Sequence, residues 1–396
     1  MKKISRLAEL EKKYINEVLD GQFSSANAYK MVVRMEQAFA KRFGMKHAIA
    51  MVNGTATLHG ALEAIEIRPG DEVICPPLTM SSTSLAILQA NATPVFADVD
   101  KDTFLVTPET VEKVITNKTK AIMPVSLYGL SPNITGMMKL AKKHNLVVIE
   151  DNAQCYLGKE NGKLTGTIGD MASYSFQSSK HITSGEGGIV ITNNDDYALK
   201  LRRYTGLGYA SISLGKARIT KDDIQDPNYD RHISLGWNYR MSDLCGAVIL
   251  AQIERMDELV EMRLIAARHF VAAVKKVEWL QPQLVPEGFR HSYWTYVVKI
   301  TSDHVNWYEF RKKYIELGGD GIYSAWKLSY LEPAFLNKSF LGREKFISEN
   351  IQYTRGLCPV AEELQPKLLQ FKTNYWDEED AIKQAEILEK TINYFK

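Results

Sequence analysis

Short apolar runs alternate with stretches of helical periodicity over the first 250 residues. Runs such as LVVIE are apolar on both alternating faces, which is typical of strands covered by helices on both sides. The predicted strands are 47–53, 71–77, 93–100, 120–129, 145–151, 171–176 and 187–193. This alternation predicts an α/β domain with a mostly parallel seven-stranded sheet flanked by helices.

The pattern changes near residue 250. Residues 251–277 contain no helix breaker and predict one long helix leading into a smaller α+β domain, with a strand at 293–300 and a helix at 305–319. We therefore expect N-terminal helices and a large domain over 1–255 and a small C-terminal domain over 256–396. The polar segment 207–233 has no predicted element, and its length is typical of a lid, a binding loop or a disordered stretch.

Bulk properties exclude several classes of protein. The 396 residues carry a formal net charge of +2 without a basic stripe, so we expect no nucleic-acid partner. No apolar run approaches the length of about 20 residues that spans a bilayer, and the N-terminus resembles an amphipathic helix more than a signal peptide. The four cysteines are scattered, which favours reduced thiols over a metal site. A cytoplasmic protein without membrane attachment follows as an expectation.

Gly54, Thr55 and Ala56 lie where a predicted strand ends and a helix begins. Small residues there expose backbone N–H groups at the positive end of the helix dipole, which favours an anion such as phosphate. The same residues also suit an ordinary capped helix after a tight turn. This turn alone leaves both interpretations open.

Asp151 ends a predicted strand, at the edge where open α/β sheets bind ligands. It could be an ordinary acid, a metal ligand or the partner of a cationic ring. Ala153 is small enough to lie flat beneath such a ring, and Gln154 adds an amide nearby.

Lys180 lies in a serine-rich turn between two predicted strands, followed by the glycine-rich bend GEGG. Most lysines are solvated, but an amine held among small residues and partly desolvated has a lowered pKa and becomes a nucleophile and base. Pyridoxal phosphate (PLP) requires a lysine, an anion cradle and an acid for its pyridine nitrogen. Lys180, the turn at 54–56 and Asp151 match these three requirements.

Several motifs in order resemble the DegT/DnrJ/StrS family of sugar aminotransferases, within the aspartate aminotransferase fold (fold type I). They are MEQAFAKRFGMKHAIAMVNGTATL, DEVICPPLTMSSTSLAILQANATPVFADVD, IMPVSLYG, VVIEDNAQC, SFQSSKHITSGEGG and GWNYRMSDLCGAVILAQIER. The resemblance runs from about residue 15 to 255 and more loosely to the C-terminus.

The resemblance implies a Schiff base between Lys180 and PLP, with Asp151 on the pyridine nitrogen. It also implies that Asn238 reaches the phosphate of the other subunit, so that a homodimer forms its active sites at the interface. The expected cofactor contacts are Gly54, Thr55, Ala56, Met80, Asp151, Ala153, Gln154, Ser175, Lys180 and Asn238.

The implied reaction is a ping-pong transfer of an amino group from glutamate to a nucleotide-linked or phosphorylated keto sugar, with the pyridoxamine phosphate form of the cofactor as intermediate. Candidate substrate contacts are His291, Tyr293, Tyr323, Trp326 and Lys327, with Lys216 and Arg218 in the 207–233 segment. The aromatic residues among them equally suit packing of the small domain against the dimer partner.

The chain departs from the family pattern at two informative positions. Met80 stands where an aromatic residue usually stacks on the ring, and a thioether also packs on a ring face. His181 follows the lysine, as in a branch of PLP-dependent sugar 3-dehydratases whose lysine is replaced by histidine. Because Lys180 is present, transamination is favoured over this dehydratase alternative. Lys180 and Asp151 together also disfavour a non-catalytic regulatory relative.

Overall fold

A seven-stranded sheet forms the body of the molecule. The computed structural model describes residues 1–24, 30–216, 219–275, 277–348 and 351–396. In spatial order the strands are β1 (His47–Met51), β9 (Gly188–Thr192), β8 (Met171–Ser175), β5 (Val147–Asp151), β4 (Thr119–Ile122), β2 (Glu72–Cys75) and β3 (Thr93–Phe96). In this sheet β9 runs opposite to the other six strands, which are parallel to one another. The predicted mostly parallel sheet is therefore confirmed.

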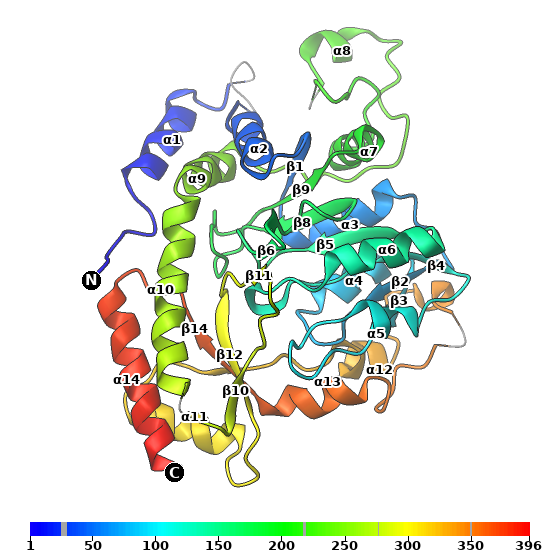
Figure 1. Cartoon of the computed structure of the whole chain (residues 1–396). Helices are drawn as coiled ribbons and strands as arrows, with labels where there is room; N and C mark the ends of the chain where they lie inside the picture. Colours follow the sequence, from blue (N-terminus) through cyan, green and yellow to red (C-terminus); the bar gives the residue numbers. More distant parts are fainter. Residues whose placement is uncertain (25–29, 217–218, 276, 349–350) are drawn as a thin grey trace.

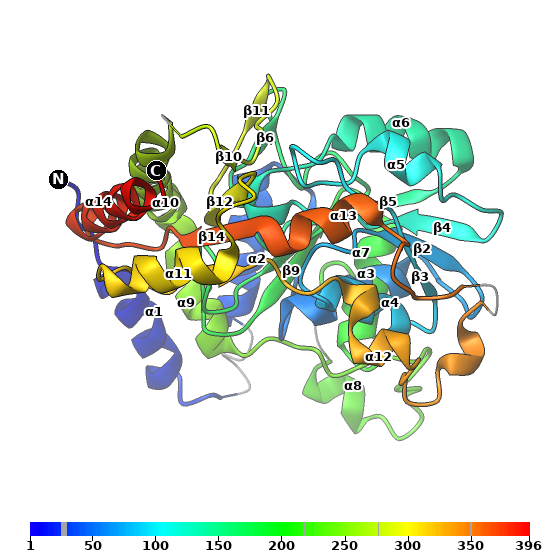
Figure 2. The same ribbon diagram turned by 90° about the horizontal axis from the view of Figure 1, so that it is seen from below.

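Helices line both sides of this sheet, as the apolar strands predicted (Figures 1 and 2). They are α3 (Gly54–Ala64), α4 (Ser82–Gln89), α5 (Pro108–Glu112), α6 (Ile134–His144) and α7 (Asp195–Thr205). Asparagine side chains cap several of them; Asn53 and Asn133, for example, accept from the Ala56 and Gly136 amides at 2.8 Å. Beside β1, α1 (Glu9–Asp20), α2 (Lys30–Phe43) and α9 (Asp243–Glu254) pack together.

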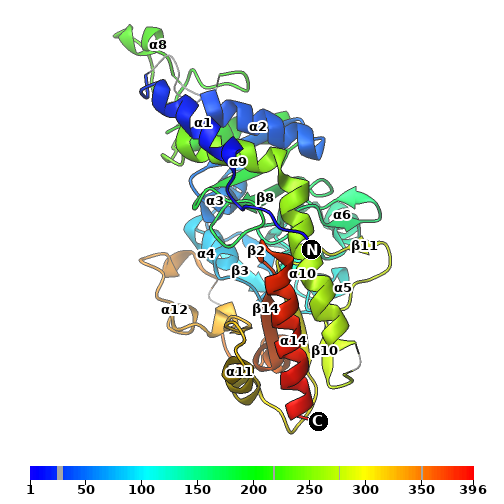
Figure 3. The same cartoon turned by 90° about the vertical axis from the view of Figure 1, so that its left-hand side faces the viewer.

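The prediction of a single long helix over 251–277 is wrong. The chain forms α9 and a second helix, α10 (Met256–Val274), that meet at Arg255, whose φ of −102° lies outside the helical range. Arg255 donates to Glu11 Oε1 at 2.7 Å and to Glu258 Oε1. The bend lets α9 pack against α1 and α2 while α10 packs against α14 (Glu378–Tyr394), as Figure 3 shows. No glycine or proline marks this bend in the sequence.

The C-terminal part forms an antiparallel four-stranded sheet. Its order is β10 (Leu280–Pro282), β12 (Thr295–Ile300), β14 (Leu368–Lys372) and β13 (Tyr323–Ser324). The predicted strand and helix are confirmed as β12 and α11 (Trp307–Glu316). The remaining short elements are β6 (Lys159–Glu160), β7 (Lys163–Leu164), β11 (Phe289–Arg290), α12 (Pro333–Leu336), α13 (Pro359–Leu364), η1 (Leu127–Gly129), η2 (Ser329–Leu331), η3 (Glu344–Phe346) and η4 (Gln365–Lys367).

Part of the C-terminal half packs on the large sheet. The ring of Phe96, in β3, lies 5.4 Å from that of Tyr330 and 5.8 Å from those of Phe335 and Tyr353. These rings belong to the same apolar core as the central strands. The division into domains 1–255 and 256–396 stays a prediction. Because the C-terminal half packs back on the large sheet, its residues 323–327 line one side of the site described below.

The 207–233 segment projects from the body and contains one short helix, α8 (Lys221–Gln225) (Figure 1). Lys216 pairs with Asp223 at 2.6 Å in this segment. Arg218 lies outside the described residues. Among the helices that the structure describes, none combines the length and apolar character needed to cross a membrane.

Candidate active site

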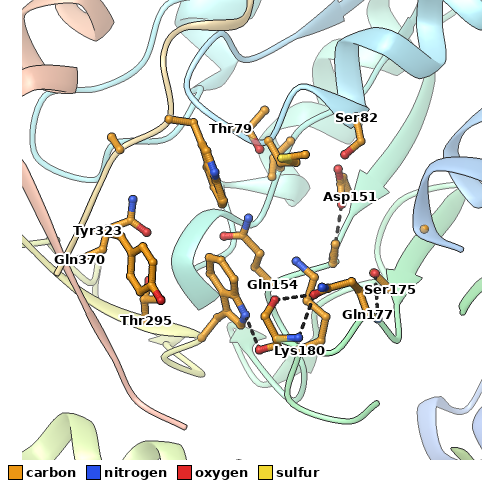
Figure 4. A pocket seen from close by; sticks show the side chains of 18 of the residues that line it. Thr79, Ser82, Asp151, Gln154, Ser175, Gln177, Lys180, Thr295, Tyr323 and Gln370 are labelled. Atoms are coloured by element: carbon orange, nitrogen blue, oxygen red, sulfur yellow. Dashed lines mark hydrogen bonds between the residues drawn. The ribbon is translucent and has the colours of Figure 1, made fainter. Parts of the chain in front are cut away.

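A cavity of about 1060 Å³ lies where the carboxyl ends of the central strands meet the N-terminus of α3 and the C-terminal sheet. Figure 4 shows its side chains, with Asp151, Ser175 and Lys180 on one side and Tyr323 and Gln370 on the other. Of the predicted site residues, the lining includes Gly54, Thr55, Met80, Asp151, Ala153, Gln154, Ser175, Lys180, Tyr323, Trp326 and Lys327. The fold therefore gathers residues from widely separated segments in one place.

The N-terminus of α3 opens into this cavity. Within the described chain, the amides of Gly54 and Thr55 make no hydrogen bond, whereas the Ala56 amide donates to Asn53 Oδ1. A Cβ on Gly54 would lie 2.8 Å from Cβ of Ser175, so only glycine allows β8 and the helix to approach this closely. The two free amides and the nearby Ser175 hydroxyl form a cradle suited to a phosphate group.

Asp151, the last residue of β5, is 4% exposed on the cavity wall. Its Oδ2 accepts from Thr83 Oγ1 at 2.8 Å and its Oδ1 accepts from the Ala153 amide at 3.1 Å. Burial raises the pKa of Asp151, and these two hydrogen bonds and the positive charge of Lys180 oppose that rise. No lysine, arginine or histidine of the described chain forms a salt bridge with it. A cationic ring nitrogen would satisfy this carboxylate.

Lys180 lies in the turn that follows β8. Its backbone N–H donates a hydrogen bond within this turn, to the Gln177 carbonyl at 2.9 Å. Its Nζ lies 4.6 Å from the centre of the Trp294 ring. Burial, and secondarily the positive charge of Arg263, lowers the pKa of Lys180 to about 8, against the attraction of Asp151. A substantial neutral fraction of this amine is therefore present near pH 8.

Three other predicted cofactor contacts line the same cavity. Ala153 and Met80 offer small or apolar surface, and Met80 is 48% exposed. Gln154 is buried, and its Oε1 accepts from the Tyr128 amide at 2.8 Å. Because this hydrogen bond occupies Oε1, the side-chain NH2 group of Gln154 is the part of the amide that can bind a ligand.

The outer part of the cavity is aromatic and cationic. Trp326 stacks on Trp294 with ring centres 5.8 Å apart, while Tyr323 is 60% exposed. Lys372 pairs with Asp320 at 2.8 Å, whereas Lys327 makes no salt bridge within the described chain. Lys327 is therefore the exposed cation available to an anionic substrate.

The prediction that His291 contacts the substrate is wrong. Its ring is 6% exposed and does not line the cavity, because Nε2 bonds Gln283 Oε1 at 3.0 Å and Nδ1 accepts from the Tyr293 amide at 2.8 Å. Tyr293 stacks on this ring, with centres 3.9 Å apart, and also lies off the cavity lining. Lys216 is likewise absent from the lining.

Ala56 and Asn238 also lie outside the cavity lining. Asn238 borders a separate recess with Arg240 and Ser242, so its contribution to a partner's phosphate site stays a prediction. His181 is fully buried, and its Nε2 bonds the Ser292 carbonyl at 2.9 Å. His181 therefore bonds the backbone and does not line the cavity.

Sequence reasoning missed Thr83, Arg263 and Trp294. Thr83 falls within an apolar helix pattern, and only the fold places its hydroxyl against Asp151. Arg263 could have been noticed in the sequence, because it is a charged residue among the apolar positions of α10. Trp294 is one of many aromatic residues in the C-terminal half, and nothing local distinguishes it.

The fold and this cavity define a PLP-dependent transferase of fold type I. The residues present fit the cofactor, because the free amides of α3, the room left by Gly54, the uncompensated Asp151 carboxylate and the amine of Lys180 share one cavity. The groups that bind an anion, a cationic nitrogen and an aldehyde are thus all present.

Comparison with known proteins identifies the family. The model of the DegT/DnrJ/EryC1/StrS aminotransferase family matches residues 5–365. GDP-perosamine synthase of Caulobacter vibrioides is 38% identical over 74% of this chain and 76% of its own length. GDP-perosamine synthase of Escherichia coli O157:H7 is 36% identical over 72% and 73%, respectively. An aminotransferase from Psychrobacter cryohalolentis superposes with a TM-score of 0.86 at 28% identity, covering 100% of this chain and 99% of that one.

The chain belongs to the DegT/DnrJ/EryC1/StrS aminotransferase family, and it is a PLP-dependent aminotransferase.

Proposed function

We propose that this enzyme transfers an amino group from glutamate to a keto sugar linked to a nucleoside diphosphate. The observation that carries the proposal is the amine of Lys180, with a lowered pKa, in one cavity with the buried carboxylate of Asp151. The similarity to two GDP-perosamine synthases supports a nucleotide-linked sugar as substrate.

The cofactor contacts follow from the cavity wall. Gly54, Thr55 and Ser175 would hold the phosphate, and Asp151 would hold the pyridine nitrogen in its protonated form. When bound, PLP accepts the electron pair left at the donor carbon and, as pyridoxamine phosphate, carries the amino group to the second substrate. In this proposal Lys180 Nζ removes and returns a proton, and its lowered pKa, which leaves it partly neutral near pH 8, supports this role.

The outer cavity supports the choice of substrate. Tyr323 and Trp326 offer flat faces that can stack on a sugar or base. The ammonium of Lys327, which forms no salt bridge with any described residue, suits a phosphate or carboxylate. The total volume of about 1060 Å³ leaves space beyond the cofactor for a large second substrate.

The dehydratase alternative is not favoured. It would require another residue to replace the lysine as proton carrier, yet Lys180 is present and His181 is buried away from the cavity. The regulatory alternative is not favoured either, because Lys180 and Asp151 are both retained in the cavity.

The absorption spectrum of the purified protein with added PLP tests the proposal. We expect a visible band that disappears on addition of glutamate, with 2-oxoglutarate formed in proportion, and no such band in Lys180→Ala. Lys200→Ala, which removes a partly exposed lysine that pairs with Asp196 and does not line the cavity, is the matched control and should keep the band. A band that glutamate leaves unchanged would reject glutamate as donor, and failure to form any band would reject the PLP site.

A further inference from the structure

Two arginines converge on the backbone of the lysine turn. Arg6, in the arm before α1, donates through Nη2 to the carbonyls of Ser178 at 2.6 Å and Lys180 at 3.0 Å. Arg263, in α10, donates through Nη2 to the carbonyls of Ser179 at 2.8 Å and Lys180 at 3.0 Å. The carbonyl of Lys180 therefore receives one hydrogen bond from each guanidinium.

Arg263 is unusual because its charge is buried without an anion from any part of the chain that the structure describes. Its side chain is 1% exposed, and no salt bridge joins it to any carboxylate of the described chain. Its other arm, Nη1, donates to the Trp294 carbonyl at 2.8 Å and to Thr373 Oγ1 at 3.3 Å. Burying a charge that only neutral groups solvate is costly, which indicates that the position serves a purpose beyond packing.

Trp294 links this arginine to the reactive amine. Its ring lies 4.6 Å from Lys180 Nζ, its Nε1 donates to the Ser179 carbonyl at 2.9 Å, and its own carbonyl accepts from Arg263. Arg263 thus holds both the backbone of the lysine and the ring against which the lysine side chain lies. Nη1 and Nη2 are occupied by these acceptors, so the forked end of Arg263 is not free to bind a substrate carboxylate; within the described residues only its buried Nε has no hydrogen-bond partner.

We propose that Arg263 is a positioning residue for Lys180, supported by Arg6 of the N-terminal arm, and that its unpaired charge helps to keep the amine neutral. This inference rests on the proposed role of Lys180. The charged or titratable groups around the amine are Arg263 of α10, Asp151 of β5, which acts in the opposite direction, His181, which is buried, and Glu186 of the glycine-rich bend. Burial remains the main cause of the lowered pKa of Lys180.

The reactivity of Lys180 in the cofactor-free chain measures this effect directly. The full-length protein, freed of carbonyl compounds with hydroxylamine, is labelled with acetic anhydride between pH 6 and 11, and acetylation of Lys180 is followed by mass spectrometry. Only the neutral amine reacts, so labelling should increase as the pH rises through about 8. In Arg263→Gln we expect labelling at pH 8 to fall about fivefold, the result of moving the pKa upward by about one.

Two further variants separate charge from position. Arg263→Lys keeps the charge but loses the forked donor, so it should preserve the pH dependence of labelling while speeding hydrogen exchange of the amides at 178–181. Arg6→Gln, on the partly exposed arm, should also speed this exchange. Arg268→Gln, on the same helix with an exposed ion pair to Glu261, is the matched control and should change neither readout.

The proposal would be overturned if Arg263→Gln folds and both its labelling curve and its amide exchange equal those of the unmodified chain. If that variant does not fold, Arg263→Lys and Arg6→Gln decide, because unchanged exchange in both would equally overturn it. Neither readout involves PLP or a sugar. A chain that binds no PLP would therefore refute the proposed function without affecting this result.

Discussion

Asp151 and Lys180 face the same cavity, and burial acts on them in opposite directions. It raises the pKa of the carboxyl group and lowers that of the amine, because a low-dielectric site disfavours both charged forms. Their mutual attraction partly offsets both effects. The site therefore favours a cationic nitrogen beside Asp151 and the neutral form of the Lys180 amine.

Thr83 is expected to keep Asp151 ionised. In Thr83→Val, Asp151 Oδ2 loses the hydroxyl donor at 2.8 Å, so the pKa of Asp151 should rise further. PLP should bind about 10- to 100-fold more weakly, because a hydrogen bond to a charged group contributes about 1.5–3 kcal/mol. Titration with PLP followed by absorbance measures this. Because the carboxylate protonates as the pH falls, the acid limit of PLP binding should move to higher pH.

Ser84→Ala is the control for this prediction. Ser84 is buried in the same helix, but its hydroxyl donates to the Ser81 carbonyl and does not meet Asp151. Equal PLP affinity in Thr83→Val and Ser84→Ala would show that the Thr83 hydroxyl has no part in the site.

At the scale of elements, the cradle depends on how closely α3 approaches β8. In Gly54→Ala the new Cβ would lie 2.8 Å from Cβ of Ser175, so the helix N-terminus must move away from the strand. We expect weaker PLP binding and a loss of stability of about 1–3 kcal/mol, typical of overpacking. PLP titration and urea unfolding measure the two effects.

Gly215→Ala is the matched control, since a Cβ there meets open space. It should leave both PLP affinity and the unfolding midpoint unchanged. If Gly54→Ala behaved in the same way, the close approach of helix and strand would not matter for the site.

At the scale of the whole molecule, the segment before Asn238 exposes apolar side chains. Ile233, Leu235 and Trp237 are 53%, 84% and 42% exposed, next to the residue expected to reach a partner's phosphate. Large apolar groups clustered in this way are typical of interaction surfaces. We expect a homodimer of 44.8 kDa chains that buries this segment.

Leu235→Asp should therefore weaken the dimer, because a carboxylate would have to lose its water at the interface. Sedimentation should show monomer at concentrations where the unmodified chain is dimeric, and PLP affinity should fall with it. Leu341→Asp, at a position 92% exposed and remote from Asn238 in sequence, is the control. A dimer of unchanged strength in Leu235→Asp would place the interface elsewhere.

The sequence by itself determined the architecture and the centre of the site. All seven strands were predictable because each contains a short run rich in apolar residues, such as 146–149 before the acids Glu150 and Asp151, which is typical of a buried strand. Gly54, Asp151 and Lys180 were predictable as residues of one site because Asp151 ends a strand and the other two follow a strand, at the edge where an α/β sheet binds its ligand. These signals are local, so the order of residues alone contains them.

Only the tertiary structure decided which distant groups support that centre. The bend at Arg255 arises from contacts with α1 and not from a helix breaker, so no local pattern predicts it. His291 seemed available as a substrate contact until the fold buried both ring nitrogens in hydrogen bonds. Arg263, Thr83 and Trp294 act through contacts between residues 31 to 115 positions apart in the chain. Such contacts depend on how helices and sheets pack, which the local sequence does not specify.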